Sequence, residues 1–111
     1  MTFALLAIVL STAPASKPVF VTEYVDCAAT AQDGGGVALF ANVFTNGMAS
    51  VSCSAGTSVA VDSVSAKGAL SCRVGDWLVT FHLNTQEGIA IRAGRKSPPL
   101  RMFCSRFFLR S

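Results

Sequence analysis

Few side chains in this sequence could carry acid, base or nucleophilic chemistry, and none stands in a catalytic spacing. His82 is the only histidine among 111 residues, so a serine- or cysteine-based hydrolase would have to use it as its base. No serine occupies a G-x-S-x-G elbow. Glu23 and Asp26 lie on opposite faces of a predicted strand, so they do not form the carboxylate pair of a glycosidase. We predict no catalytic residues and no cofactor.

The four cysteines fit disulfides better than a metal site. A structural zinc site uses closely spaced cysteine or histidine ligands, and the sequence has no C-x-x-C pair. Each cysteine shares strand parity with apolar neighbours, which points all four toward a core. An even number of cysteines in a small secreted chain predicts two disulfides. The residues are Cys27, Cys53, Cys72 and Cys104, and all three pairings stay open.

The compartment follows from the start of the chain. Residues 1–15 hold a short apolar run and end in Ala13-Pro14-Ala15, which is typical of a secretory signal peptide cleaved after Ala15. The run is too short to span a bilayer. We therefore expect a secreted, extracellular protein, or a periplasmic one if the source is bacterial, with residues 16–111 forming a single domain.

The charged residues are unevenly distributed along the chain. From residue 16 to 88 there are three cations and six acids, whereas residues 89–111 hold six cations and no acid. Such an excess predicts an acidic partner or a membrane face, or else pairing between the two parts of the chain. The candidate partner-binding residues are Arg92, Arg95, Lys96, Arg101, Arg106, Phe107, Phe108 and Arg110.

Hydrophobic alternation predicts the fold class. Apolar residues recur with period two, and turn residues follow every eight to twelve positions. This pattern is typical of a small antiparallel β-sandwich or barrel of about six to eight short strands, here stapled by two disulfides. The predicted strands cover residues 18–27, 37–44, 48–53, 57–64, 69–73, 77–84 and 89–93.

Two local segments carry more specific expectations. Asn46-Gly47 predicts a type I′ turn, because both residues tolerate positive φ angles. Residues 100–111 fit either a strand or an amphipathic helix, and we favour the strand. In that strand Leu100, Met102 and Cys104 face inward, and the alternation slips around Ser105.

These features favour a small secreted, non-enzymatic binding protein of the effector, toxin or inhibitor type. Its expected partner is a protein or another acidic macromolecular surface outside the producing cell, and nucleic acid is not expected. One alternative is a membrane-active or antimicrobial protein that acts through the basic, Phe-rich end. Another is a small secreted hydrolase that uses His82 or dispersed acids.

Overall fold

The computed structural model describes residues 18–94, 96 and 98–109, and these residues form eight antiparallel strands without a helix. The expected signal peptide, residues 1–15, lies outside the described residues. The all-β prediction is confirmed. The strands are β1 (Val21–Thr30), β2 (Gly36–Phe44), β3 (Met48–Ala55), β4 (Ser58–Ser65), β5 (Ala69–Val74), β6 (Trp77–His82), β7 (Glu87–Arg92) and β8 (Leu100–Phe108).

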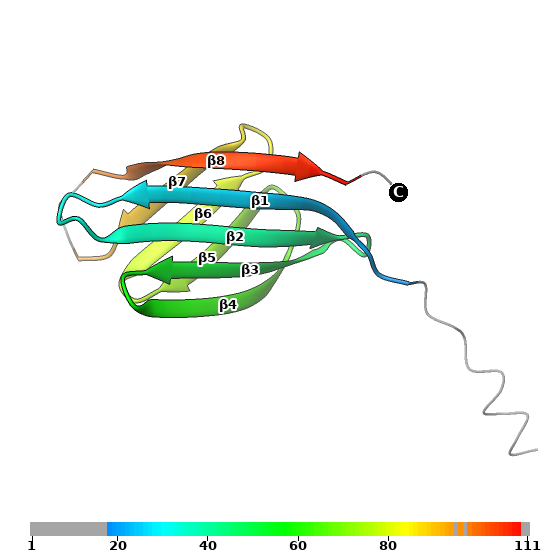
Figure 1. Ribbon diagram of the computed structural model, residues 1–111, viewed down its shortest axis with the longest axis horizontal. Coiled ribbons are helices and arrows are strands. Elements are labelled where there is room, and N and C mark those ends of the chain that lie inside the picture. The colour runs from blue at the N-terminus through cyan, green and yellow to red at the C-terminus, as the bar shows by residue number, and fades with distance from the viewer. Residues whose placement is uncertain (1–17, 95, 97, 110–111) are drawn as a thin grey trace, which may run out of the picture.

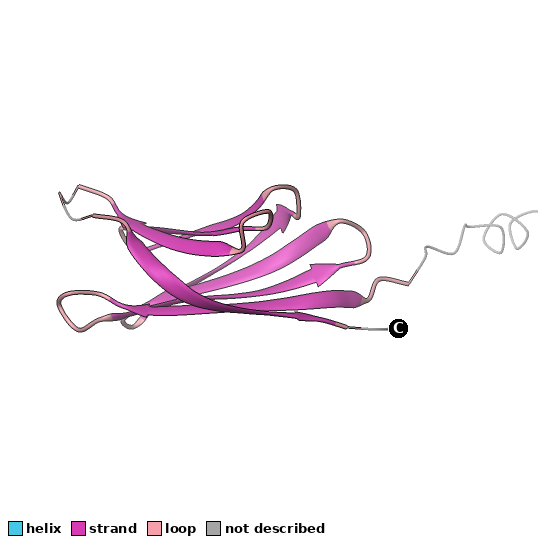
Figure 2. Cartoon of the chain, turned by 90° about the horizontal axis from the view of Figure 1, so that it is seen from above, coloured by secondary structure: helices cyan, strands magenta, loops and turns pink. Residues whose placement is uncertain are grey.

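The strands make one sheet in the order β4-β3-β2-β1-β8-β7-β6-β5 (Figure 1). It consists of two four-stranded meanders, β1 to β4 and β5 to β8, joined where β1 pairs with β8. Seen from above, the sheet folds over on itself into two layers (Figure 2). The edge strands β4 and β5 approach each other, so the sheet is a nearly closed barrel.

Alternation along each strand sends apolar side chains into the barrel. In β3, Ala49, Val51 and Cys53 are buried, while the serines between them face outward. In β6, Val79 and Phe81 are fully buried, and Phe81 is the largest such side chain in the core. The interior of the barrel is therefore a packed hydrophobic core.

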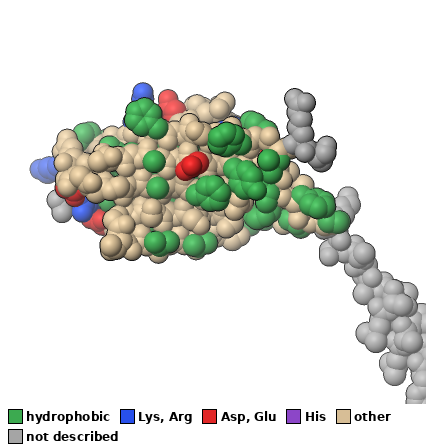
Figure 3. Space-filling view, in the orientation of Figure 1, with side chains coloured by type: hydrophobic (Ala, Val, Ile, Leu, Met, Phe, Trp, Pro, Cys, Tyr) green, Lys and Arg blue, Asp and Glu red, His purple; other side chains and the backbone are tan. Residues whose placement is uncertain are grey.

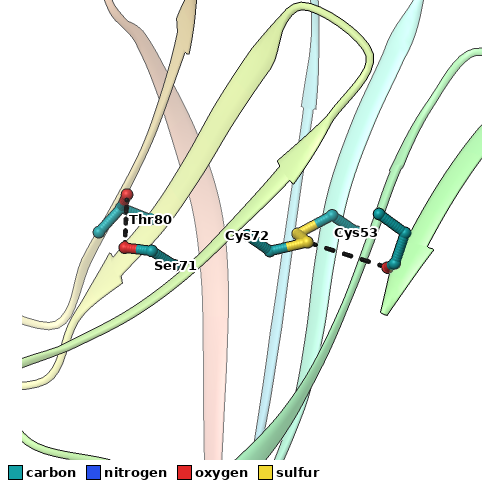
Figure 4. Close-up of a disulfide and its surroundings, with 5 residues drawn as sticks. Cys53, Ser71, Cys72 and Thr80 are labelled. Carbon is teal, nitrogen blue, oxygen red and sulfur yellow. Dashed lines mark hydrogen bonds between the residues drawn. A yellow bond between two sulfur atoms is a disulfide. The ribbon is translucent and has the colours of Figure 1, made fainter. Parts of the chain in front are cut away.

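The two disulfides join parts of the sheet that are distant in sequence. Cys27 and Cys104 are directly paired residues of β1 and β8, and we call their bond the terminal disulfide. Cys53 of β3 and Cys72 of β5 form the seam disulfide, which crosses the interior behind the open edge of the barrel (Figure 4). The structure thus selects one of the three pairings that the sequence left open. Both bonds are consistent with an oxidising compartment.

The surroundings of these disulfides limit what fits beside them. The Cys72 sulfur lies 3.8 Å from the carbonyl oxygen of Ala60 on β4, a contact that involves no donated proton because the sulfur is disulfide-bonded. On the outer face beside it, the Ser71 and Thr80 hydroxyls hydrogen-bond at 3.1 Å between β5 and β6 (Figure 4). Gly88 of β7 leaves room for the terminal disulfide, because a Cβ there would overlap the sulfur of Cys104.

The β2–β3 hairpin forms where predicted, but the predicted turn type is wrong. The amide of Gly47 donates to the Phe44 carbonyl at 3.1 Å, so the turn spans residues 44–47. Gly47 has a φ of +80°, and among the described non-glycine residues only Gln86 has a positive φ. Asn46 instead accepts a hydrogen bond from the Met48 amide at 3.0 Å. The register of β2 and β3 requires a three-residue loop, and a type I turn followed by a left-handed glycine fills it.

The C-terminal segment is a strand from Leu100 to Phe108, as favoured from the sequence, but the predicted slip at Ser105 is wrong. The register with β1 continues unbroken from Phe103 to Phe108. Arg106 therefore keeps the inward parity of Met102 and Cys104. This charged side chain can occupy an inward position because it forms an ion pair with Glu23 inside the barrel.

The edge strand β4 has apolar side chains that are exposed to solvent. Val59 and Val61 face outward and are 70% and 64% exposed. Asp62 pairs with buried Val51, so it has inward parity, yet it is exposed because the barrel is open beside it. A charge pointing inward on an edge strand is a common protection against pairing with another chain.

Candidate binding surface

The predicted basic residues do not form one continuous surface, because two of them are paired with acids at opposite ends of the barrel. Arg92 donates from Nε to Asp76 at 2.9 Å and from Nη1 to Asp33 at 3.2 Å. Its guanidinium also lies 5.4 Å from the centre of the Trp77 ring. The pKa of Arg92 is raised above its ordinary value, mainly because of the hydrogen bond to Asp76. Arg92 therefore ties the β1–β2 loop to the β5–β6 turn.

Arg106 lies inside the other end of the barrel. Its Nε and Nη2 donate to the two carboxylate oxygens of buried Glu23, and its Nη1 donates to the Leu83 carbonyl at 3.0 Å. The guanidinium also lies over the rings of Phe81 and Phe108, 6.0 and 4.7 Å from their centres. Pairing between the acidic and basic parts of the chain, the third explanation of the uneven charge, thus accounts for Arg92 and Arg106.

The remaining predicted residues are dispersed. Lys96 and Arg101 are exposed near the start of β8, and Phe107 and Phe108 are exposed near its end. Arg95 and Arg110 lie outside the described residues. Among the described members of the predicted set, therefore, only Lys96 and Arg101 are exposed cations without an ion pair.

A hollow of about 460 Å³ adjoins Arg92. Trp77, Pro98, Pro99 and Leu100 supply its apolar wall, and Asp33 and Lys96 supply charged groups. The Arg92 guanidinium is already held by two carboxylates and the Trp77 ring. The charged groups at this end of the barrel therefore form a structural ion-pair network.

Of the groups named for the hydrolase alternative, His82 is not placed beside a nucleophile among the described residues, whereas two of the dispersed acids, Asp33 and Asp76, meet at Arg92. His82 is exposed at the end of β6, directly paired with Glu87 of β7. Within residues 18–94, 96 and 98–109 its side chain has no hydrogen bond to a hydroxyl or thiol. All four cysteines are in disulfides. No group of three or more His, Cys, Asp or Glu side chains among the described residues is placed to hold a metal ion.

The largest concentration of exposed aromatic side chains lies on the outer face of β8, β1 and β2. Phe103 and Phe107 of β8 are 88% and 59% exposed, and Phe40 of β2 is 42% exposed. Tyr24 of β1 stacks on Phe40, with ring centres 6.0 Å apart and planes at 22°. We call these four residues together with Asp26 the aromatic face. Figure 3 shows hydrophobic side chains gathered on this side of the molecule around one acidic group.

The strand register places Asp26 among the aromatic residues. Asp26 is directly paired with Phe40 on one side and with Ser105 on the other. Tyr24 is two positions away on the same strand and the same face, and it is directly paired with Phe107. Phe103 is diagonal to Asp26, because it flanks Ser105 on β8. Among the described residues Asp26 has no ion-pair partner.

The neighbouring part of the same outer face is different in composition. The outward residues of β3 are Ser50, Ser52 and Ser54, which are directly paired with Asn42, Phe40 and Ala38 of β2. Aromatic side chains are thus confined to one part of the sheet. Exposed apolar side chains that are rimmed by polar residues, as here by the serines of β3, are a common feature of interaction surfaces.

The predicted partner-binding residues included Phe107 but not the other members of the aromatic face, which are Tyr24, Asp26, Phe40 and Phe103. The alternation placed Tyr24 and Asp26 on the face of their strand opposite Val25 and Cys27, but residues 37–44 are apolar on both faces, so nothing in the sequence indicated that Phe40 is exposed. What it lacked was the pairing of β1 with β8, which brings residues about 80 positions apart side by side.

Among residues 18–94, 96 and 98–109, no helix is long and apolar enough to cross a membrane. Comparisons with protein-family models, curated proteins and solved structures found no match to this chain. The function of the protein therefore has to be inferred from the geometry of its described residues.

Proposed function

We propose that this chain is a non-enzymatic binding protein that recognises a macromolecular surface outside the producing cell through its aromatic face. The single observation that carries the proposal is the exposure of Phe103 and Phe107 on β8 and of Phe40 on β2, the two strands that flank β1. Secretion and the effector, toxin or inhibitor role are parts of the same proposal. The two disulfides support the extracellular setting.

The physical argument is the cost of keeping aromatic rings in water. Covering a Phe side chain on binding removes apolar area from water at about 25 cal/mol per Å², and aromatic residues are enriched at the centres of protein interfaces. The sheet beneath these rings is held by hydrogen bonding on both sides of β1 and by the terminal disulfide. Such a scaffold loses little conformational freedom when a partner binds.

Site-specific photo-crosslinking would test this function. A benzophenone amino acid replaces Phe103, and the matched control replaces Arg73, which is exposed on β5 in the other meander. We expect a saturable adduct with extracellular partner material from position 103, and none from position 73. Unlabelled wild-type protein should compete for the adduct, whereas a Phe40→Ser/Phe107→Ser variant should not. Equal labelling from both positions, or no competition, would contradict the proposal.

Membrane binding is the second candidate, and a separate apolar cluster favours it. Val19, Phe20, Phe108 and Leu109 are 52%, 63%, 66% and 45% exposed at the end of the barrel where β1 begins and β8 ends. The Leu109 amide donates to the Thr22 carbonyl at 2.8 Å, which holds the two segments side by side. An exposed apolar cluster of this kind is able to insert into a lipid headgroup region.

Vesicle co-sedimentation separates this candidate from the first. If the cluster binds lipid, the wild-type protein sediments with phosphatidylglycerol vesicles at low salt, and a Phe108→Ser/Leu109→Ser variant does not. The control variant Phe103→Ser, on the aromatic face, should sediment as the wild type does. If the wild-type protein does not sediment with the vesicles, membrane binding is excluded, and the proposal that the aromatic face binds a macromolecule is not affected.

A further inference from the structure

We infer that the partner of the aromatic face presents an arginine side chain, which pairs with Asp26 among the surrounding aromatic rings. This inference rests on the proposed function. The charge of Asp26 and the aromatic side chains around it determine which chemical group can enter the centre of the face.

A partner that binds the aromatic face would bury the Asp26 carboxylate. A partner that covers Phe40, Phe103 and Phe107 also removes water from the carboxylate between them. A carboxylate buried without a counter-charge is strongly unfavourable, so the complex forms only if the partner supplies a cation or several hydrogen-bond donors. No described residue of this chain supplies that cation.

Of the two permanently cationic side chains, arginine fits this site better than lysine. A guanidinium can donate two parallel hydrogen bonds to a carboxylate while its flat face stacks on aromatic rings. Tyr24 and Phe40, already stacked 6.0 Å apart, offer aromatic surface next to Asp26. A lysine ammonium can approach the carboxylate, but it is more strongly hydrated and has no planar face to stack. Arginine therefore satisfies both features of the site.

The molecule contains two internal examples of this recognition. Arg92 pairs with Asp33 and Asp76 while it lies over Trp77, and Arg106 pairs with Glu23 while it lies over Phe81 and Phe108. Asp26 with Tyr24 and Phe40 presents the same combination of carboxylate and aromatic rings without an arginine from the described chain.

The test uses three short peptides as probes for the arginine side chain. They are acetylated and amidated tripeptides with tryptophan at both ends and with arginine, lysine or citrulline in the middle. Citrulline has nearly the shape of arginine but no charge. Binding is followed on the full-length oxidised protein by two-dimensional NMR, which reports affinity, location and foldedness together.

We expect the arginine peptide to bind about 5-fold more tightly than the citrulline peptide, because both can donate hydrogen bonds to the Asp26 carboxylate but only arginine adds an ion pair, which at an exposed site contributes up to about 1 kcal/mol. Binding of the lysine peptide should be intermediate. The shifted signals should cluster at Tyr24, Asp26 and Phe40. In Asp26→Asn the preference for arginine should be lost, whereas it should persist in the control Glu87→Gln, which neutralises an exposed acid on β7.

Several results would overturn the inference. Equal affinity for arginine and citrulline would show that the face binds without a cation, and would leave the proposed function standing. Binding by neither peptide, or an arginine preference that survives Asp26→Asn, would also refute it. Sedimentation of the protein alone is measured in parallel, and a reversible dimer that Asp26→Asn dissociates would assign the face to a second copy of the chain. The proposed function itself is judged separately, by the crosslinking from position 103.

Discussion

The ion pair between Glu23 and Arg106 should make a large contribution to stability, because both side chains lie mostly inside the barrel. Their exposed fractions are 10% for Glu23 and 18% for Arg106. We therefore predict that Glu23→Gln, which preserves shape but removes the charge, strongly destabilises the protein. The guanidinium would keep its hydrogen bond to Leu83 but lose its counter-charge.

The magnitude depends on the contacts that the variant leaves in place. Removing one partner of a fully buried ion pair costs about 3–5 kcal/mol. Here Arg106 keeps one carbonyl acceptor, two aromatic contacts and some water, so we expect about 2–3 kcal/mol. For a domain of this size that loss lowers the melting temperature by roughly 8–24 °C.

The assay is thermal and urea unfolding of the oxidised protein, with both disulfides verified by intact mass. The variants Glu23→Gln, Arg106→Gln and their double form a cycle that isolates the interaction between the two side chains. A further variant, Glu23→Leu/Arg106→Leu, should recover most of the stability, since apolar pairs often replace buried ion pairs at little cost. A loss below about 0.5 kcal/mol in Glu23→Gln, or strictly additive single effects, would refute this reasoning.

Three further predictions concern the barrel itself. Gly88→Ala should lower the free energy of unfolding, measured in urea, by about 1–3 kcal/mol, because the added Cβ overlaps the terminal disulfide. The control Gly36→Ala should lower it clearly less, because there is open space around Gly36. Replacing Cys53 and Cys72 together by serine should lower the free energy of unfolding by about 3 kcal/mol. Amide hydrogen exchange should accelerate more in β4 and β5 than in the other strands, and an equal acceleration in all strands would contradict the role of the seam disulfide. Asp62→Val should promote concentration-dependent light scattering by removing the charge from the edge strand, and unchanged scattering would show that the edge is protected otherwise.

The sequence predicted those features that depend on near neighbours along the chain. The strand positions followed from alternation, as in β3, where serines alternate with Ala49, Val51 and Cys53. Turn type was harder, because the loop at Asn46-Gly47 is set by how β2 and β3 are registered.

Features that depend on distant residues could not be read from one segment at a time. The inward Arg106 is explained only by Glu23, which precedes it by 83 positions. The six cations of residues 89–111 predicted either a binding surface or pairing within the chain, and only the structure shows that Arg92 and Arg106 pair with acids at opposite ends of the barrel. The aromatic face needed the pairing of β1 with β8, for which no local pattern exists.

The sheet order has a consequence for how the chain could be rewired. The neighbours β1 and β8 contain the two ends of the described chain, and the edges β4 and β5 are consecutive in sequence. A circular permutant that joined residue 109 to residue 20 and opened between residues 65 and 69 would run β5 to β8 and then β1 to β4. Every strand pair would then become a hairpin, and the mean sequence separation of contacts would fall. Since folding rates rise as contact order falls, the permutant should fold faster to the same barrel.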